Sequence, residues 1–360
     1  MTYTLSSVKI IKRVPKTEDN PFGCIIVDKI PVDKPSVIAF GGELALSERA
    51  ANSYAKQIQT LLYEYDIHDI DVYSVVYNFG SRAAKLERAE QFRIAGRRLL
   101  KEDVNPIVKY EQDTTLNKMR KNEPIPNYVK QLFDILLLPR ISNSDNQPLN
   151  KDEAIFRMRK NFYYGHCQGA STIWQMANYM YDKMLEIGYT PDNIKEIQHE
   201  LFVVQHSPVA PLTKQKFNTL SFASAEDTMM QYHNNMFADW VYENSADVIP
   251  SFFDKKNGNI FVAGHLQEIP FKEHTNIGLT RAEELASPLT EDGQIIFSAE
   301  RNAIVRAARK VISGEKIKSI AELTDGNGVD FKQLKQNGDT LYNVMLYDLR
   351  QQNLKPSHQK

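Results

Sequence analysis

The chain has 360 residues, of which 42% are hydrophobic and 25% are charged, so it is long enough to bury a sizeable core. We expect one large domain with insertions. The formal net charge of −1 shows no excess of the positive charge that nucleic-acid binding requires, and we predict no nucleic-acid partner.

The first elements along the chain alternate between buried strands and helices. Residues 36–42 and 72–79 form apolar runs of strand length, and each precedes a helical pattern, at residues 47–65 and 82–101. This alternation is typical of a parallel sheet with crossover helices, and it predicts an α/β fold with a mostly parallel, doubly wound sheet.

A region rich in proline and asparagine follows, and we predict an insertion at about residues 100–150. Inside it, residues 128–138 have a helical pattern. Asn150 is placed to cap a further helix over residues 151–160, which would lead into a strand at residues 161–164.

The most informative motif follows that strand. Gly165-His166-Cys167-Gln168-Gly169 ends an apolar run and opens a long helical pattern, which is the context of a nucleophile elbow. In such a turn the flanking glycines allow a tight backbone, and the central side chain is held out at the sheet edge. With Ala170, the motif resembles the Gly-His-Ser-Gln-Gly-Ala form of the α/β-hydrolases, with a cysteine in place of serine as in dienelactone-hydrolase-like members.

Two other interpretations of this cysteine stay open. A free cysteine also packs as a small buried hydrophobe, with no chemical role. A single sequence also leaves open that Cys167 is an engineered replacement for serine.

Beyond the elbow, residues 171–187 form a helical pattern that ends at Gly188 and carries a methionine stripe typical of core packing. Strands are expected at residues 201–204, 219–223 and 259–264, with a second insertion at residues 228–257. A hairpin turning at residues 254–259 is the alternative for the last of these strands.

The C-terminal part has amphipathic helical patterns at residues 298–312 and 339–351. We therefore divide the chain into an α/β-hydrolase-like domain at residues 1–290 and a C-terminal helical extension at residues 291–360 that packs on it. This extension offers a surface for a protein partner.

The resemblance implies a catalytic triad in the order nucleophile, acid, histidine. Asp227, with Glu226 as the alternative, follows the strand expected to carry the acid. His265 follows the last strand, and Gly264-His265-Leu266 resembles the Gly-His-Leu of many α/β-hydrolases. His206 is the alternative base, and the other histidines weighed are His233 and His274. Acidic residues before a helical pattern also serve as ordinary helix caps.

Oxyanion donors would be the backbone N–H of Gln168 and the loop at Gly41 and Gly42, whose small residues let amides approach a ligand. A thiolate there would attack an activated small-molecule acyl substrate, and an acyl-thioenzyme would form. The predicted function is a cysteine-dependent hydrolase or acyltransferase for an ester, lactone or thioester. The alternatives are a catalytically inactive hydrolase-fold protein that binds a partner, or a small-molecule binding module.

The sequence contains no zinc spacing, phosphate-loop lysine motif or dinucleotide fingerprint, so we expect no metal and no cofactor. Its two cysteines, Cys24 and Cys167, are far apart, which argues against a disulfide framework. Residues 1–16 lack a secretory apolar segment, and no run approaches 18 apolar residues. We therefore expect a cytoplasmic protein with no membrane span.

Overall fold

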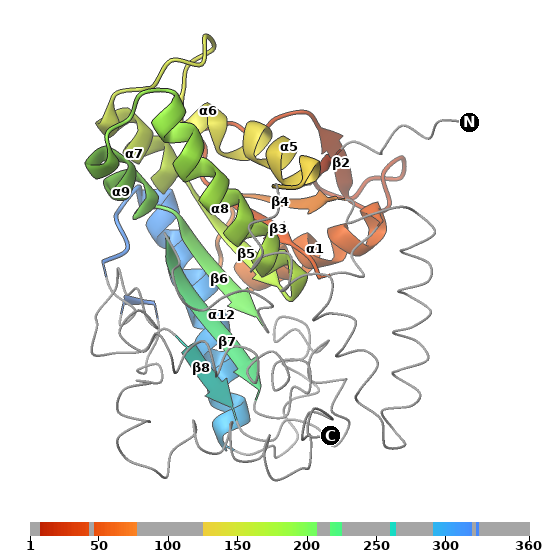
Figure 1. The fold of residues 1–360 in the computed structure, drawn as a ribbon. Helices are drawn as coiled ribbons and strands as arrows, with labels where there is room; N and C mark the ends of the chain where they lie inside the picture. Colours follow the sequence, from red (N-terminus) through yellow and green to blue (C-terminus); the bar gives the residue numbers. More distant parts are fainter. Residues whose placement is uncertain are drawn as a thin grey trace, which may run out of the picture.

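In the computed structural model of the protein, the described residues are 8–42, 47–77, 125–206, 217–224, 260–263, 291–318 and 322–323. They form a single central sheet with helices on both faces (Figure 1). The arrangement confirms the predicted α/β class and the mostly parallel sheet.

The sheet has eight strands in the order β2-β1-β4-β3-β5-β6-β7-β8. The six strands from β4 to β8 in this order are parallel, while β1 is antiparallel to both of its neighbours, β2 and β4. The strands are β1 (Lys9–Arg13), β2 (Cys24–Val27), β3 (Ser36–Phe40), β4 (Asp71–Val76), β5 (Asn161–His166), β6 (Phe202–His206), β7 (Asn218–Ser224) and β8 (Ile260–Ala263).

The described helices cover the two faces of this sheet. They are α1 (Glu48–Glu64), α5 (Asn127–Leu136), α6 (Leu138–Ile141), α7 (Lys151–Arg159), α8 (Gln168–Glu186), α9 (Pro191–Gln198) and α12 (Glu291–Ser313). Helices α1 and α12 pack on one face, and the helices from α5 to α9 pack on the other (Figure 1).

Alternating side chains along the strands build two cores. On β5, Phe162 and Tyr164 join the core under α1 and α12, whereas Tyr163 joins the core under α5 and α8. On β3, Ile38 and Phe40 point to the second of these cores. Because both faces of the central strands are buried, these strands are mostly apolar, as is typical of parallel sheets.

Side-chain caps fix where several helices begin. The hydroxyl of Ser47 accepts a hydrogen bond from the N–H of Ala50 and so caps α1. Asn150 Oδ1 accepts from the N–H of Glu153 at 2.8 Å and caps α7, which confirms the predicted cap. These residues satisfy helix N–H groups that have no partner inside the helix.

The predicted strands and helices in the described residues are present, with ends that differ by up to three residues, except that α12 begins seven residues before its predicted start. The last strand, β8, pairs in parallel with β7 and ends the order of the described strands. The antiparallel pair β1 and β2 and the short helices α6 and α9 were not predicted. The predicted helices at residues 82–101 and 339–351 lie outside the described residues, as does the second insertion at residues 228–257.

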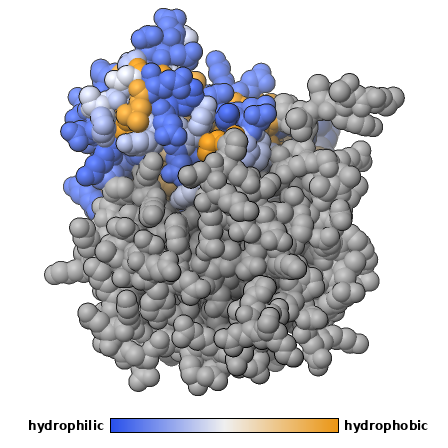
Figure 2. All heavy atoms as spheres, in the orientation of Figure 1, coloured by the Kyte–Doolittle hydropathy of each residue, from blue (hydrophilic) through white to orange (hydrophobic). Residues whose placement is uncertain are grey.

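The described surface on one face is largely hydrophilic, with small separate groups of apolar residues (Figure 2). Among the helices that the structure describes, none is long and apolar enough to cross a membrane.

Candidate active site at the β5–α8 turn

Cys167 lies at a sharp turn between β5 and α8, where the sequence predicts a nucleophile elbow. Its backbone has φ 52° and ψ −120°, and the helix begins at the next residue, Gln168. A positive φ with this ψ lies outside the left-handed helical region and is unusual for any residue with a Cβ. The turn therefore holds Cys167 in a strained conformation, of the kind that costs about 1–3 kcal/mol and persists only where the surroundings impose it.

Backbone hydrogen bonds on both sides of Cys167 hold this turn. The N–H of Cys167 donates to the carbonyl oxygen of His206, at the end of β6, at 3.1 Å. The carbonyl oxygen of Cys167 accepts from the N–H of Ala170 at 3.1 Å. The cysteine is only 5% exposed.

The glycines of the motif are required by close packing. A Cβ on Gly169 would lie 2.3 Å from the carbonyl oxygen of Phe40, so the first turn of α8 is pressed against the end of β3. A Cβ on Gly165 would lie 3.0 Å from Ile173 Cδ1 and 3.1 Å from the backbone of Ala170. Side chains at either position would push the strand and the helix apart.

The Gly41–Gly42 loop lies directly beside the turn, as predicted. A Cβ on Gly42 would be 3.2 Å from Cys167 Cβ and 3.1 Å from His166 Nδ1. The hydroxyl of Tyr77 donates to the carbonyl oxygen of Gly41 at 3.0 Å and fixes the loop from the other side. The structure thus brings Gly41, Gly42 and Gln168 together around Cys167.

Tyr54, on α1, joins this loop to the turn. The N–H of Gly42 donates to the Tyr54 hydroxyl at 3.3 Å, and the same hydroxyl lies 2.9 Å from His166 Nδ1. When the hydroxyl donates to Nδ1, the imidazole of His166 is the neutral tautomer with its proton on Nε2. Burial is the main cause that raises the pKa of Tyr54, the hydrogen bond from Gly42 opposes this rise, and the neighbouring Cys167 adds to it. The phenol is therefore protonated at neutral pH.

A buried carboxylate is bonded to the histidine at the end of β6. Glu300, on α12, is fully buried; its Oε2 is 2.9 Å from His206 Nδ1, and its Oε1 accepts from the Tyr164 hydroxyl at 3.1 Å. The His206 ring is also next to the His166 ring, with centroids 5.6 Å apart. His206, the alternative base, thus has a carboxylate partner that the sequence did not predict.

The preferred acid and base lie outside the described residues. The preferred acid is Asp227 and the preferred base is His265. The alternative acid Glu226 and the other two histidines, His233 and His274, also lie outside the described residues. The strands that precede the two preferred residues are described: β7 ends at Ser224 and β8 at Ala263. Because both strands are parallel to β5, their last residues lie at the same edge of the sheet as the Cys167 turn.

Tyr54 and Glu300 were missed because their partners are distant in the sequence. The sequence nevertheless contains a pattern that could have identified Glu300. It lies on the face of α12 that carries Ala303, Ile304 and Ala307, all of them buried, so it is an acidic residue in an apolar stripe. Tyr54 has no such pattern, because in the sequence it is one aromatic residue among others on an amphipathic helix.

Within the described residues, no cluster of three or more His, Cys, Asp or Glu side chains is placed to hold a metal ion. No protein-family model matches the chain, and no curated protein matches it either.

Proposed function

We propose that the protein is a cysteine-dependent acyl hydrolase or acyltransferase with a fold of α/β-hydrolase type. The observation that carries the proposal is the conformation of Cys167, a non-glycine residue held at φ 52° and ψ −120° between a parallel strand and a helix. Such strain at one residue, imposed by packed glycines and a neighbouring loop, is typical of a residue whose side chain must be presented for chemistry.

In the proposed reaction the Cys167 thiolate attacks the carbonyl carbon of an ester, lactone or thioester. The carbonyl electron pair moves to oxygen, and the backbone N–H groups of Gln168 and of the Gly41–Gly42 loop stabilise the negative charge. The tetrahedral intermediate then expels the alcohol or thiol, which takes a proton from the histidine, and the acyl group remains on sulfur. Water or another nucleophile releases it.

His265 with Asp227 is the proposed base and acid pair, with Glu226 as the alternative acid. The support is the position of the preceding strands, β7 and β8, whose ends lie at the same sheet edge as Cys167. His206 is the alternative base, with Glu300 as the carboxylate that orients its Nδ1.

A specific observation favours a second function, that of a catalytically inactive protein of this fold that binds a small molecule or a partner. The N–H of Gly42, which an oxyanion would need, is bonded to the Tyr54 hydroxyl, and Cys167 itself is almost completely buried. A hydrolase would have to exchange the Gly42 bond for the substrate, whereas a binding protein has no such need.

The test uses single-cysteine variants and an acyl panel. Cys24→Ser leaves only Cys167, and Cys167→Ser leaves only Cys24. We expect alkylation of Cys167 by iodoacetamide to follow an apparent pKa below the ordinary value of about 8.5, because a helix N-terminus stabilises the thiolate. We expect Cys167→Ala to reduce kcat/KM on p-nitrophenyl esters and thioesters by at least about a thousandfold, and Cys24→Ser to leave it unchanged.

Two results would contradict the enzyme proposal. The first is turnover by Cys167→Ala that equals the wild type. The second is a wild-type protein that turns over no member of the panel and whose Cys167 is alkylated only at the pH of an ordinary thiol, which would favour the binding protein.

A further inference from the structure

A second unusual group lies in the core on the α5 to α9 side of the sheet, away from the Cys167 turn. Arg140, on α6, is completely buried. Its Nη1 donates to the carbonyl oxygen of Leu136, but neither Nε nor Nη2 has an acceptor among the protein atoms. Burial lowers the pKa of this guanidinium from its usual value, because the charged form has lost its hydration.

The phenol groups of Tyr163 and Tyr73 are close enough to Arg140 to interact with its charge. Tyr163, on β5, is also completely buried, and its hydroxyl has no hydrogen-bond partner. Burial raises the pKa of Tyr163 to about 12, against the opposing effect of the neighbouring Arg140 charge. Tyr73 is on β4, which β3 separates from β5. Its hydroxyl donates a hydrogen bond to Asp71 at 3.0 Å.

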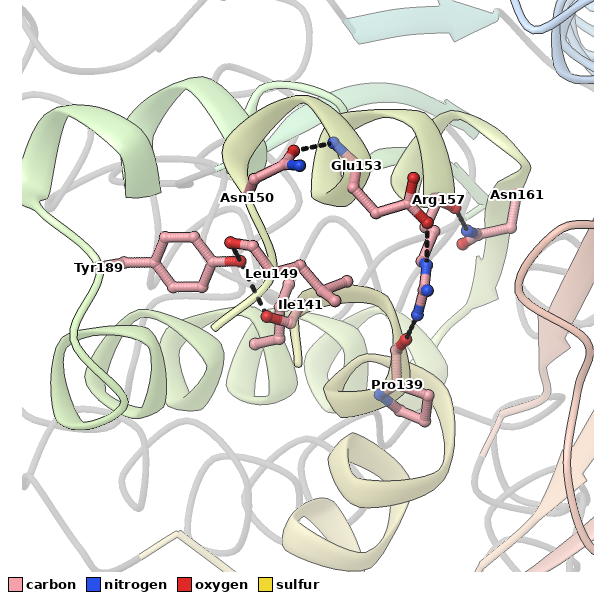
Figure 3. A network of polar contacts seen from close by, with 8 residues as sticks. All are labelled: Pro139, Ile141, Leu149, Asn150, Glu153, Arg157, Asn161 and Tyr189. Carbon is pink, nitrogen blue, oxygen red and sulfur yellow. Dashed lines mark hydrogen bonds and ion pairs between the residues drawn. The ribbon is translucent and has the colours of Figure 1, made fainter. Parts of the chain in front are cut away.

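No described carboxylate neutralises Arg140. Asp71 is bonded to Lys12 as well as to Tyr73, and of the acidic residues that the structure describes, none forms an ion pair with Arg140. The nearby cation Arg157 is already paired: its Nε binds Glu153 at 2.7 Å, and its Nη1 donates to the carbonyl oxygen of Pro139 at 2.8 Å (Figure 3). The described surroundings of Arg140 thus carry one uncompensated positive charge.

The two free nitrogens define the shape of a partner. Nε and Nη2 lie on one edge of the guanidinium, and their N–H bonds run nearly parallel, so that edge matches two oxygens of one planar anion. The hydroxyl of Tyr163, which also has no hydrogen-bond partner and interacts electrostatically with Arg140, is the candidate for a third donor. One uncompensated charge favours a monovalent anion, and a cation buried without a counter-ion is strongly unfavourable.

We propose that Arg140 and Tyr163 form an internal site for a small monovalent oxyanion, of the carboxylate class, bound through two oxygens. The site is separate from Cys167: Tyr163 precedes it by four residues along β5, or roughly 13 Å at the usual rise of a strand. The anion serves the fold as a counter-ion and exchanges through local opening of the helices above it.

The experiment measures thermal unfolding of the full chain in sodium formate and in sodium chloride at equal ionic strength. In formate the wild-type Tm should rise by about 2–4 °C for each tenfold increase in concentration above the Kd, because only the folded state has the site. Arg140→Met, which removes the charge and keeps an apolar chain of similar length, should show no difference between the two salts. Arg159→Met, which removes an arginine that is already paired with Glu200, should respond as the wild type does.

A second variant, Tyr163→Phe, keeps the guanidinium and tests the proposal if Arg140→Met does not fold. Tyr163→Phe removes only the third donor, and the formate concentration needed for half of the effect should rise at least about tenfold. A crystal structure from formate should show planar density on the Nε and Nη2 edge. The proposal is overturned by equal salt responses in wild type and Tyr163→Phe, or by density on that edge for a water molecule or for a carboxylate of the chain itself.

Discussion

The strain at Cys167 is produced by neighbours rather than by the cysteine. Of the described residues other than glycine, three have a positive φ, and the other two are Asp66 and Asn146, types that adopt this conformation readily. Cys167 differs because its turn is fixed by Gly169 against β3 and by a hydrogen bond to β6. The conformation should therefore depend on the glycine more than on the nucleophile.

Replacing Gly169 with Ala tests this dependence. The new Cβ would lie 2.3 Å from the Phe40 carbonyl oxygen, a backbone atom that cannot rotate away. We expect a loss of about 3 kcal/mol or more in the free energy of unfolding, together with loss of any activity that depends on the turn. Urea unfolding followed by circular dichroism measures the first effect.

Gly188→Ala is the matched control. Gly188 has φ +106°, and nothing lies within 4 Å of an added Cβ, so its cost is conformational alone, about 1–2 kcal/mol. An equal or smaller loss for Gly169→Ala would mean that α8 moves away from β3 without difficulty.

Single residues also mark the limit of sequence reasoning. Cys167, Gly41 and Gly42 could be predicted because each follows its strand directly in the chain. Tyr54 could not, because its partner His166 is 112 positions away and only the packing of α1 on the sheet brings them together. The unpaired Nε and Nη2 of Arg140 could not be predicted either, because a sequence shows that a residue is charged but not whether it has a partner.

At the scale of elements, α12 is more than an added surface layer. Its buried residues pack into the same core as α1 and the central strands, and Glu300 joins it to Tyr164 of β5 and to His206 at the end of β6. The helix was predicted from its amphipathic pattern, as part of an extension that packs on the domain. The face of the sheet that it covers was not predicted, because periodicity identifies a buried face without identifying the residues that cover it.

We predict that Glu300→Ala costs about 3 kcal/mol or more in the free energy of unfolding. The change leaves the buried His206 and the Tyr164 hydroxyl without the acceptor that they share. Glu300→Gln retains an acceptor and should cost less. Chemical denaturation of the purified variants gives both values.

The control is Glu64→Gln. Glu64 is the exposed ion-pair partner of Arg301, and Arg301 follows Glu300 along α12. An exposed ion pair contributes at most about 1 kcal/mol. A loss for Glu300→Ala no greater than that of Glu64→Gln would show that the buried contact does not anchor the helix.

The antiparallel pair β1 and β2 was the main element that sequence reasoning missed. Lys9–Arg13 begins and ends with charged residues, and Cys24–Val27 is only four residues long, so neither resembles the apolar runs that marked the parallel strands. The sheet supplies the missing context, because β1 is ordered by pairing with β4 rather than by its own pattern.

For the whole molecule, His199 predicts how stability depends on pH. Burial, helped by Lys316 and Lys195, lowers the pKa of this histidine to about 4 from an ordinary value of 6.5. Between these two values the unfolded chain binds a proton that the folded chain does not. The contribution of His199 to stability is therefore complete above about pH 6.5 and is lost as the pH falls toward 4.

We expect the difference in unfolding free energy between wild type and His199→Gln to shrink as the pH is lowered. Urea titrations at pH 7, 5.5 and 4.5 measure this difference directly, and the pH 7 value provides the baseline for lost packing. Carboxylates that do not interact with His199 titrate alike in both proteins and cancel in the comparison. A difference that is constant across the three pH values would contradict the lowered pKa.

Within the described residues, the two margins of the sheet are formed by its shortest strands. β2 and β8 have four residues each, whereas the six strands between them have five to seven. A short outer strand offers few unpaired amide and carbonyl groups to another chain, which limits the addition of foreign strands. Ile25 and Ile26 on β2 are about half exposed, so the brevity of this strand, more than its composition, protects the protein against self-assembly into fibres.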